Sequence, residues 1–196
     1  MASHARTGHG NAWASAYGHP ILPLSTARDV RTQVRWGRRD FEHRFGRAPE
    51  GMWLPEMAVD RTALAALAEA GITLALLAPH QARRIRPLGA GDTAWTPVTP
   101  ESLDVRRLYR CLLPGGGFVD VLFRHAALSH GVAFGALLRD GVELAKRLRA
   151  ALDHDGSIVA VAVDGETYGH HHRFGEMALA AALRVLRVDR DVELVG

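Results

Sequence analysis

The feature that most constrains the fold is an apolar run that ends abruptly in acids, glycines and three consecutive histidines, over residues 158–176. Its first six residues, 158–163, are all apolar and mostly β-branched. They predict a strand buried on both faces, as in the parallel sheet of an α/β protein. Asp164 follows at the carboxyl end of this strand. Loops converge at that end in α/β sheets and barrels, so we expect Asp164 to lie at a functional edge.

The first half of the chain also alternates strands and helices. Residues 51–54 and 72–78 predict two further buried strands, and Asp60 is expected to cap a helix over residues 62–70 between them. Before the first of these strands, Ser25 or Thr26 can cap a helix that Gly46 ends. This strand–helix–strand rhythm predicts an α/β fold whose strands are mostly parallel.

The second half adds a hairpin and further helices. Residues 106–112 and 118–123 predict paired strands joined by a glycine-rich turn. Ser129 is expected to cap a helix that continues through Leu152, with an irregularity at Gly141. Strong helix formers after Glu176 predict another helix. The two prolines around residues 20–23 indicate an extended, buried loop that would hold His19 firmly.

Composition limits the class of protein. A chain of 196 residues with 47% hydrophobic residues is long enough for one sizeable core, so we expect a single domain, 1–196. The net charge of +3 arises from basic residues interleaved with acids, which argues against nucleic acid as a partner. No apolar run approaches the roughly 20 residues of a membrane span, and the first ten residues lack a signal core. The single Cys111 excludes an intramolecular disulfide and fits a cytoplasmic protein.

Polar side chains follow the ends of several predicted strands. Glu56 ends the strand 51–54, as Asp164 ends the strand 158–163. A pair of acids facing one cleft is what glycoside cleavage requires, because one attacks or stabilises the anomeric carbon while the other protonates the leaving oxygen. Histidines and tryptophan suit sugar recognition by hydrogen bonding to hydroxyls and stacking on ring faces. We therefore expect substrate contacts from His19, Trp53, His80, His125, Glu166, His170 and His171.

Three segments together resemble glycoside hydrolase family 57. They are residues 19–24 (HPILPL), residues 51–56 (GMWLPE) and residues 164–172 (DGETYGHHH), and the similarity extends over nearly the whole chain. It is strongest to a bacterial branch similar to α-amylases and glycogen-branching enzymes. The resemblance implies part of an incomplete (β/α)7 barrel that acts on α-glucans with retention of anomeric configuration. It implies Glu56 as the nucleophile and Asp164 as the general acid/base, with no metal or organic cofactor.

The sequence departs from the family pattern in two places. The first family motif, an early histidine pair with a proline on the first barrel strand, has no counterpart, so we expect that strand to be absent. Relatives tend to carry an acid where this chain has His125. Replacing the acid by histidine removes an acceptor for a sugar hydroxyl.

Two alternatives stay open on the sequence. A metal-dependent polysaccharide deacetylase would need histidines from strand ends around one Zn²⁺, but consecutive histidines in an extended segment point in alternate directions, so at most two could share one ion. The other alternative is a non-catalytic glucan-binding remnant. The glucan and its linkage, the choice between hydrolysis and transfer, and the oligomeric state are not encoded in recognisable motifs.

Overall fold

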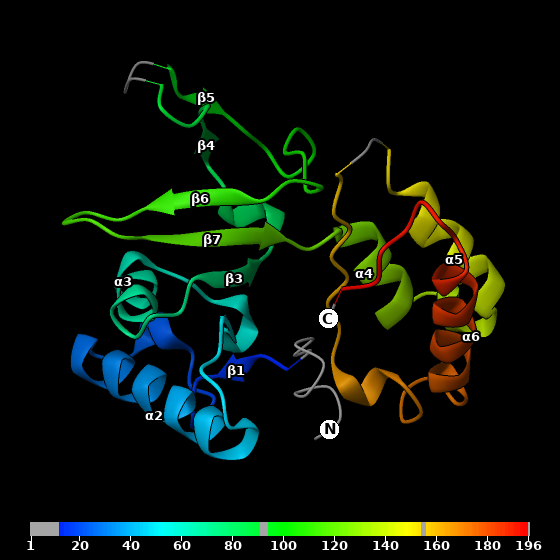
Figure 1. The fold of residues 1–196 in the computed structure, drawn as a ribbon, viewed down its shortest axis with the longest axis horizontal. Helices are drawn as coiled ribbons and strands as arrows, with labels where there is room; N and C mark the ends of the chain where they lie inside the picture. The colour runs from blue at the N-terminus through cyan, green and yellow to red at the C-terminus, as the bar shows by residue number, and fades with distance from the viewer. Residues whose placement is uncertain (1–11, 91–93, 154–155, 196) are drawn as a thin grey trace. The chain divides into compact units, whose positions relative to one another are not determined.

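The computed structural model describes residues 12–90, 94–153 and 156–195 (Figure 1). The chain forms two compact units. The sheet unit comprises residues up to Leu103 together with Leu108–Phe123. The helical unit comprises Asp104–Arg107 and Arg124–Val195.

A five-stranded sheet organises the sheet unit, in the order β1-β2-β3-β7-β6. Strands β1, β2, β3 and β7 are parallel, and β6 pairs antiparallel with β7 as the predicted hairpin. The prediction of an α/β fold with mostly parallel strands is confirmed. Strand β1 was not predicted. The strands are β1 (Ala14–Ser15), β2 (Gly51–Trp53), β3 (Leu74–Leu77), β6 (Tyr109–Leu112) and β7 (Phe118–Phe123), with a small antiparallel pair β4 (Arg84–Ile85) and β5 (Thr96–Pro97).

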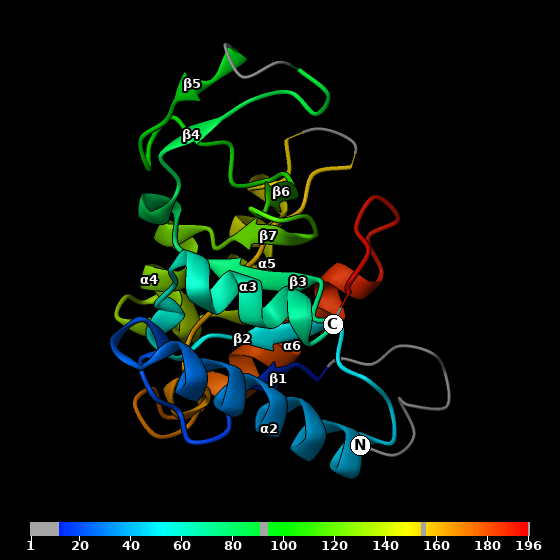
Figure 2. The same cartoon turned by 90° about the vertical axis from the view of Figure 1, so that its left-hand side faces the viewer.

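Two helices of the sheet unit lie side by side against the sheet (Figure 2). Helix α2 (Ala27–Phe45) begins at Thr26, whose hydroxyl oxygen accepts a hydrogen bond from the Asp29 amide, and ends at left-handed Gly46. Helix α3 (Arg61–Glu69) begins at Asp60, whose carboxylate accepts from the Ala63 amide at 2.7 Å. The caps predicted for both helices are confirmed. Their buried apolar faces supply most of this unit's helix–sheet core.

Helix α2 approaches β1 very closely at Gly37. A Cβ atom built on Gly37 would overlap the Ser15 carbonyl oxygen and lie 3.0 Å from its carbonyl carbon and 3.3 Å from the Tyr17 nitrogen. Only glycine therefore allows the helix backbone to lie on the strand backbone at this point.

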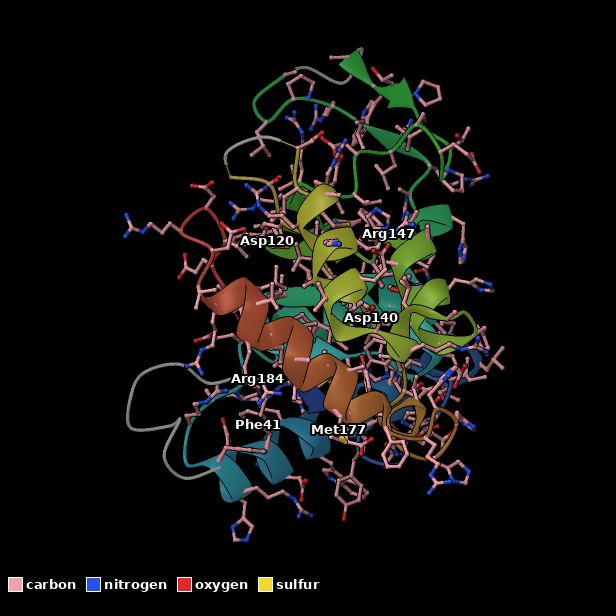
Figure 3. All side chains as sticks on the ribbon, turned by 90° about the vertical axis from the view of Figure 1, so that its right-hand side faces the viewer. Phe41, Asp120, Asp140, Arg147, Met177 and Arg184 are labelled. Carbon is pink, nitrogen blue, oxygen red and sulfur yellow. The ribbon has the colours of Figure 1, made fainter. Side chains whose placement is uncertain are left out.

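The helical unit is built on α4 (Ala126–Ala133), α5 (Gly141–Ala150) and α6 (Gly175–Arg187). Figure 3 shows α5 and α6 side by side, with Asp140 near the beginning of α5 and Met177 near the beginning of α6. No helix within the described ranges is long and apolar enough to cross a membrane. The core of this unit consists of Val132, Leu138, Leu144, Ala145, Ala182 and Leu186.

The prediction that Ser129 caps one long helix is wrong. The chain instead forms α4 and α5 with a break between them, because two other side chains provide the caps. The His125 side chain accepts from the Leu128 amide at the start of α4. The Asp140 carboxylate accepts from two amides at the start of α5. Ser129 lies buried inside α4, where its Oγ accepts a hydrogen bond from the Ala162 amide at 3.2 Å.

The prediction of a doubly buried strand at residues 158–163 is also wrong. This segment is extended but has no strand ladder. It makes an isolated parallel bridge between Ala160 and Arg124 and a hydrogen bond from the Ile158 amide to the Arg106 carbonyl oxygen, and its side chains are partly exposed. Val161 and Val163 pack against the helical core on one side. A buried strand needs a ladder of backbone hydrogen bonds and cover on both faces. Within the described part of the helical unit, the segment has helices on one side and no strand beside it.

Candidate active site

Glu56 stands at the carboxyl end of β2 in an unusual backbone conformation. Met52 and Leu54 are buried, whereas Glu56 is exposed in the short 3₁₀ helix η2 (Pro55–Met57). Glu56 has φ 58° and the next residue, Met57, has φ 51°. Each left-handed L-residue costs roughly 1–2 kcal/mol. Residues held in such conformations cluster at active sites, because the surrounding structure must enforce them. The strained turn is therefore independent support for Glu56 as a functional residue.

A glutamine that the sequence reasoning missed contacts this turn. Gln81 ends the 3₁₀ helix η3 (Pro79–Gln81), directly after β3. Its Nε2 donates a hydrogen bond to the Met57 carbonyl oxygen at 2.6 Å, and its Oε1 accepts from the Ala78 amide at 2.8 Å. No local pattern announces this contact, since the two residues it joins are 24 positions apart. Its neighbour His80 is exposed.

His19 occupies the loop after β1. The prediction that it is held in an extended, buried loop is wrong: His19 is exposed, and its φ of 55° is left-handed. Gln33 fixes the bend with two hydrogen bonds: its backbone carbonyl oxygen accepts from the Tyr17 amide, and its side-chain Oε1 accepts from the Gly18 amide. These bonds give the loop's backbone amides their acceptors on α2 at the protein surface. The two prolines that follow therefore do not require a buried loop.

Three predicted site residues come together at one edge of the sheet. His19, Glu56 and His80 follow β1, β2 and β3, which are adjacent and parallel. Parallel neighbours present their carboxyl ends at the same edge, where α/β proteins bind ligands. Trp53 is the last residue of β2 and is half-buried at that end. The sheet unit thus presents a carboxylate, two imidazoles and an indole around one sheet edge.

The loop that begins at Asp164 carries the predicted residues of the helical unit. Asp164 and Glu166 are exposed around the 3₁₀ helix η6 (Gly165–Thr167). His171 Nε2 lies 3.2 Å from Glu166 Oε1, and this contact becomes an ion pair when the imidazole is protonated. The His170 ring packs edge-on against His171, with 4.9 Å between ring centroids. In this loop the carboxylates can accept hydrogen bonds from sugar hydroxyls, and the imidazoles can donate to them or accept from them.

Interior contacts fix both ends of this loop. The Ser129 hydroxyl oxygen accepts from the Ala162 amide just before Asp164. At the other end, His172 Nε2 lies 2.8 Å from the Ala133 carbonyl oxygen. His172 therefore faces α4 while His171 faces Glu166. The segment is a hydrogen-bonded turn and not the extended segment that the sequence suggests, so the turn and not strand-like alternation gives the two rings their different directions. The half-buried His125 uses Nδ1 as the cap of α4, which gives it a structural contact beside any ligand role.

An open hollow of about 840 Å³ borders the histidine loop within the helical unit. The hollow is lined by Leu138, Arg139, Gly141, His171, His172, Arg173, Phe174, Met177 and Ala178.

Two further properties limit the chemistry of this part of the chain. Burial raises the pKa of Tyr168, which keeps its phenol protonated over a wide pH range. Within the described ranges, no group of three or more His, Cys, Asp or Glu side chains is arranged to hold a metal ion.

Comparison with known proteins gives a family match over almost the full chain. The model of glycosyl hydrolase family 57 matches residues 2–195. Comparison with curated protein sequences finds no match.

Solved structures give matches in fold. A 4-α-glucanotransferase from Thermococcus litoralis is 17% identical with a TM-score of 0.74, over 99% of this chain and 28% of that one. A family 57 branching enzyme from Thermococcus kodakaraensis, solved in complex with glucose, is 20% identical with a TM-score of 0.71, over 100% of this chain and 47% of that one. A putative polysaccharide deacetylase from Mycobacterium smegmatis is 18% identical with a TM-score of 0.66, over 100% of this chain and 62% of that one.

These matches concern the fold. They confirm the prediction that the chain has an α/β fold corresponding to part of an incomplete (β/α)7 barrel. The chain spans less than two thirds of each of these three structures.

Proposed function

Because the chain belongs to glycosyl hydrolase family 57, we propose that it cleaves or transfers glycosyl units of α-glucans with retention of anomeric configuration. Glu56 is the nucleophile and Asp164 is the general acid/base. The observation that carries this proposal is the exposed Glu56 carboxylate, held in a strained left-handed turn at the carboxyl end of a parallel strand. The similar structures named as a glucanotransferase and a branching enzyme support an α-glucan as the substrate.

The reaction has two steps. In the first, Glu56 attacks the anomeric carbon while Asp164 donates its proton to the leaving glycosidic oxygen, which forms a glycosyl-enzyme ester. In the second, Asp164 removes a proton from the acceptor, which attacks the same carbon and releases Glu56. Water as acceptor gives hydrolysis, and a glucan hydroxyl gives transfer.

Substrate recognition in this proposal uses the other predicted site residues. On the sheet unit, His19 and His80 donate to sugar hydroxyls and Trp53 offers a ring for stacking. On the helical unit, the loop residues Glu166, His170 and His171 supply further hydrogen bonds, and His125 contributes through the ring nitrogen that does not cap α4. These roles use side chains that are exposed or half-buried.

The first test measures turnover of maltoheptaose and amylose, following reducing ends and branch points separately. Glu56→Gln should abolish turnover, and Asp164→Asn should lower kcat by about 10²–10⁴-fold. Two exposed acids outside the site serve as matched controls. Glu50 stands before β2, at the opposite end of the strand from Glu56, and Asp191 lies after α6. Glu50→Gln and Asp191→Asn should keep wild-type turnover.

Azide separates the two catalytic roles. With Asp164→Ala, azide needs no base and should attack the glycosyl-enzyme, giving a glycosyl azide of retained configuration. With Glu56→Ala, azide should enter in place of the missing carboxylate and give the inverted product. Proton NMR of the anomeric region distinguishes the two. Identical products from both variants would contradict the assigned roles.

Two other outcomes would replace the proposal. Binding of maltoheptaose without turnover, unchanged by Glu56→Gln, would identify a non-catalytic glucan-binding protein. Release of acetate from an acetylated glycan that depends on stoichiometric zinc would identify a deacetylase, the activity named for one structure of similar fold. Anomeric product analysis and metal analysis on one preparation distinguish all three cases.

A further inference from the structure

We propose that Gln81 is the positioning residue that fixes the direction of the Glu56 carboxylate, acting through the Met57 carbonyl. Its catalytic meaning rests on the proposed function of Glu56. Its structural content, that one side-chain amide holds the strained turn in place, is testable without any activity.

The turn needs such a restraint because its own hydrogen bonds do not fix it. Two bonds close it locally, from the Met57 amide to the Leu54 carbonyl at 2.8 Å and from the Ala58 amide to the Pro55 carbonyl at 3.0 Å. Both bonds also fit an ordinary turn, whereas Glu56 and Met57 both adopt left-handed angles without being glycine. Such pairs persist only where surrounding structure determines them.

Gln81 supplies the outside contact. Its Nε2 donates to the Met57 carbonyl at 2.6 Å, and this carbonyl belongs to the second of the two left-handed residues. This carbonyl belongs to the peptide plane between Met57 and Ala58. The direction of that plane depends on the backbone angles of Glu56 and Met57 together. Fixing that plane restricts the turn that sets where the Glu56 side chain projects.

The amide is itself held rigidly. Its Oε1 accepts from the Ala78 amide at 2.8 Å, and Ala78 and Pro79 are both buried at the end of β3. Because the oxygen is engaged with an N–H group, the nitrogen must face the Met57 carbonyl. Strand β3 is hydrogen-bonded to β2, so Gln81 transmits the position of one strand end to the catalytic turn of the next.

Hydrogen exchange by NMR tests the structural step. Gln81→Glu keeps the acceptor for Ala78 but has no donor for Met57, and Gln81→Met keeps the length but loses both. Both variants should speed exchange of the Met57 and Ala58 amides by at least about tenfold relative to the Val34 amide of α2. Gln33→Met is the matched control, since Gln33 Oε1 also accepts from a backbone amide, that of Gly18. It should speed exchange of Gly18 and leave Met57 unchanged.

Kinetics test the catalytic step. Misplacing a catalytic group by about 1 Å can cost about 10²-fold in rate. We expect Gln81→Glu to lower kcat about 10–100-fold per folded molecule while KM stays within about threefold, with the folded fraction measured by near-ultraviolet circular dichroism. A residue that only stabilised the fold would lower the folded fraction and leave kcat per folded molecule unchanged.

The outcomes separate this proposal from the proposed function. Unchanged exchange at Met57 and Ala58 in both variants would overturn the positioning role, as would faster exchange with an unchanged kcat. If the wild-type chain shows no Glu56-dependent turnover, the proposed function fails, and the exchange measurement alone then decides whether Gln81 holds the turn.

Discussion

Replacing Gly37 by alanine tests the contact that sets the distance between α2 and β1. In an isolated helix this change would be favourable, because alanine is a better helix former than glycine by about 1 kcal/mol. In the folded chain the new Cβ would overlap the Ser15 carbonyl oxygen and crowd two more backbone atoms. Backbone atoms of a strand cannot rotate away as a side-chain end can, so the helix itself must move by roughly 1 Å.

The two effects oppose each other, and their sizes decide the sign. Overpacking of a tight core costs about 1–3 kcal/mol, and a clash with backbone belongs at the upper end of that range. Subtracting the propensity gain of about 1 kcal/mol leaves a net loss of about 2 kcal/mol for Gly37→Ala. With an m-value of about 2 kcal/mol per molar urea, the unfolding midpoint should fall by about 1 M.

Tryptophan fluorescence during urea unfolding provides the assay, because all four tryptophans belong to the sheet unit that contains Gly37. Thr32→Ala is the control in the same helix. It gives up only a hydrogen bond within α2, to the Arg28 carbonyl, and improves helix propensity, so the midpoint should stay level or rise slightly. A midpoint for Gly37→Ala at or above that of the wild type would refute the close packing of α2 on β1.

The helical unit offers three more tests. Burial alone would raise the pKa of Asp104, but hydrogen bonds from two arginines outweigh it and lower the pKa to about 2. A carboxyl whose pKa lies below the unfolded value of about 4 stabilises the fold above pH 4, and this effect is lost as the pH falls to 2. Asp104→Asn should therefore cost about 1–2 kcal/mol at pH 7 and little at pH 2, measured by urea unfolding followed by far-ultraviolet circular dichroism, because the helical unit contains no tryptophan. Ser129→Ala leaves the Ala162 amide without its acceptor and should cost about 1–3 kcal/mol, with faster hydrogen exchange at that amide. Phe174→Gly should raise stability by about 1 kcal/mol in the same assay, because Phe174 has φ 65° and is 55% exposed; a loss would show that its ring contacts outweigh the strain.

The candidate site was only partly visible in the sequence. Glu56 and His80 were placed at strand ends from local pattern alone, and the sheet confirms that β2 and β3 are parallel neighbours. The strained backbone at Glu56 could not be foreseen, because nothing in a Pro-Glu-Met sequence favours left-handed angles. Gln81 was missed for the same reason: its partner is a backbone carbonyl, which has no sequence signature.

The sequence by itself determined the elements whose signals are local. Each helix cap contacts residues within one turn of its own helix, as Thr26, Asp60 and Gly46 do. The residues that determine a cap are therefore adjacent in the sequence to the helix that they cap. The motifs in residues 19–24, 51–56 and 164–172 likewise indicated the family, since each is contiguous.

The tertiary structure decided what depends on distant partners. Residues 158–163 have the composition of a buried strand, yet a strand exists only where a neighbour supplies a ladder of hydrogen bonds. This segment has an isolated bridge to Arg124 and a single backbone hydrogen bond to Arg106 in place of a ladder. Ser129 is a residue type that often caps helices, but in the fold its hydroxyl oxygen accepts a hydrogen bond from the Ala162 amide instead. A buried backbone group bonds to a partner that the folded chain places within hydrogen-bonding distance. That partner is determined by proximity in the tertiary structure and not by proximity in the sequence.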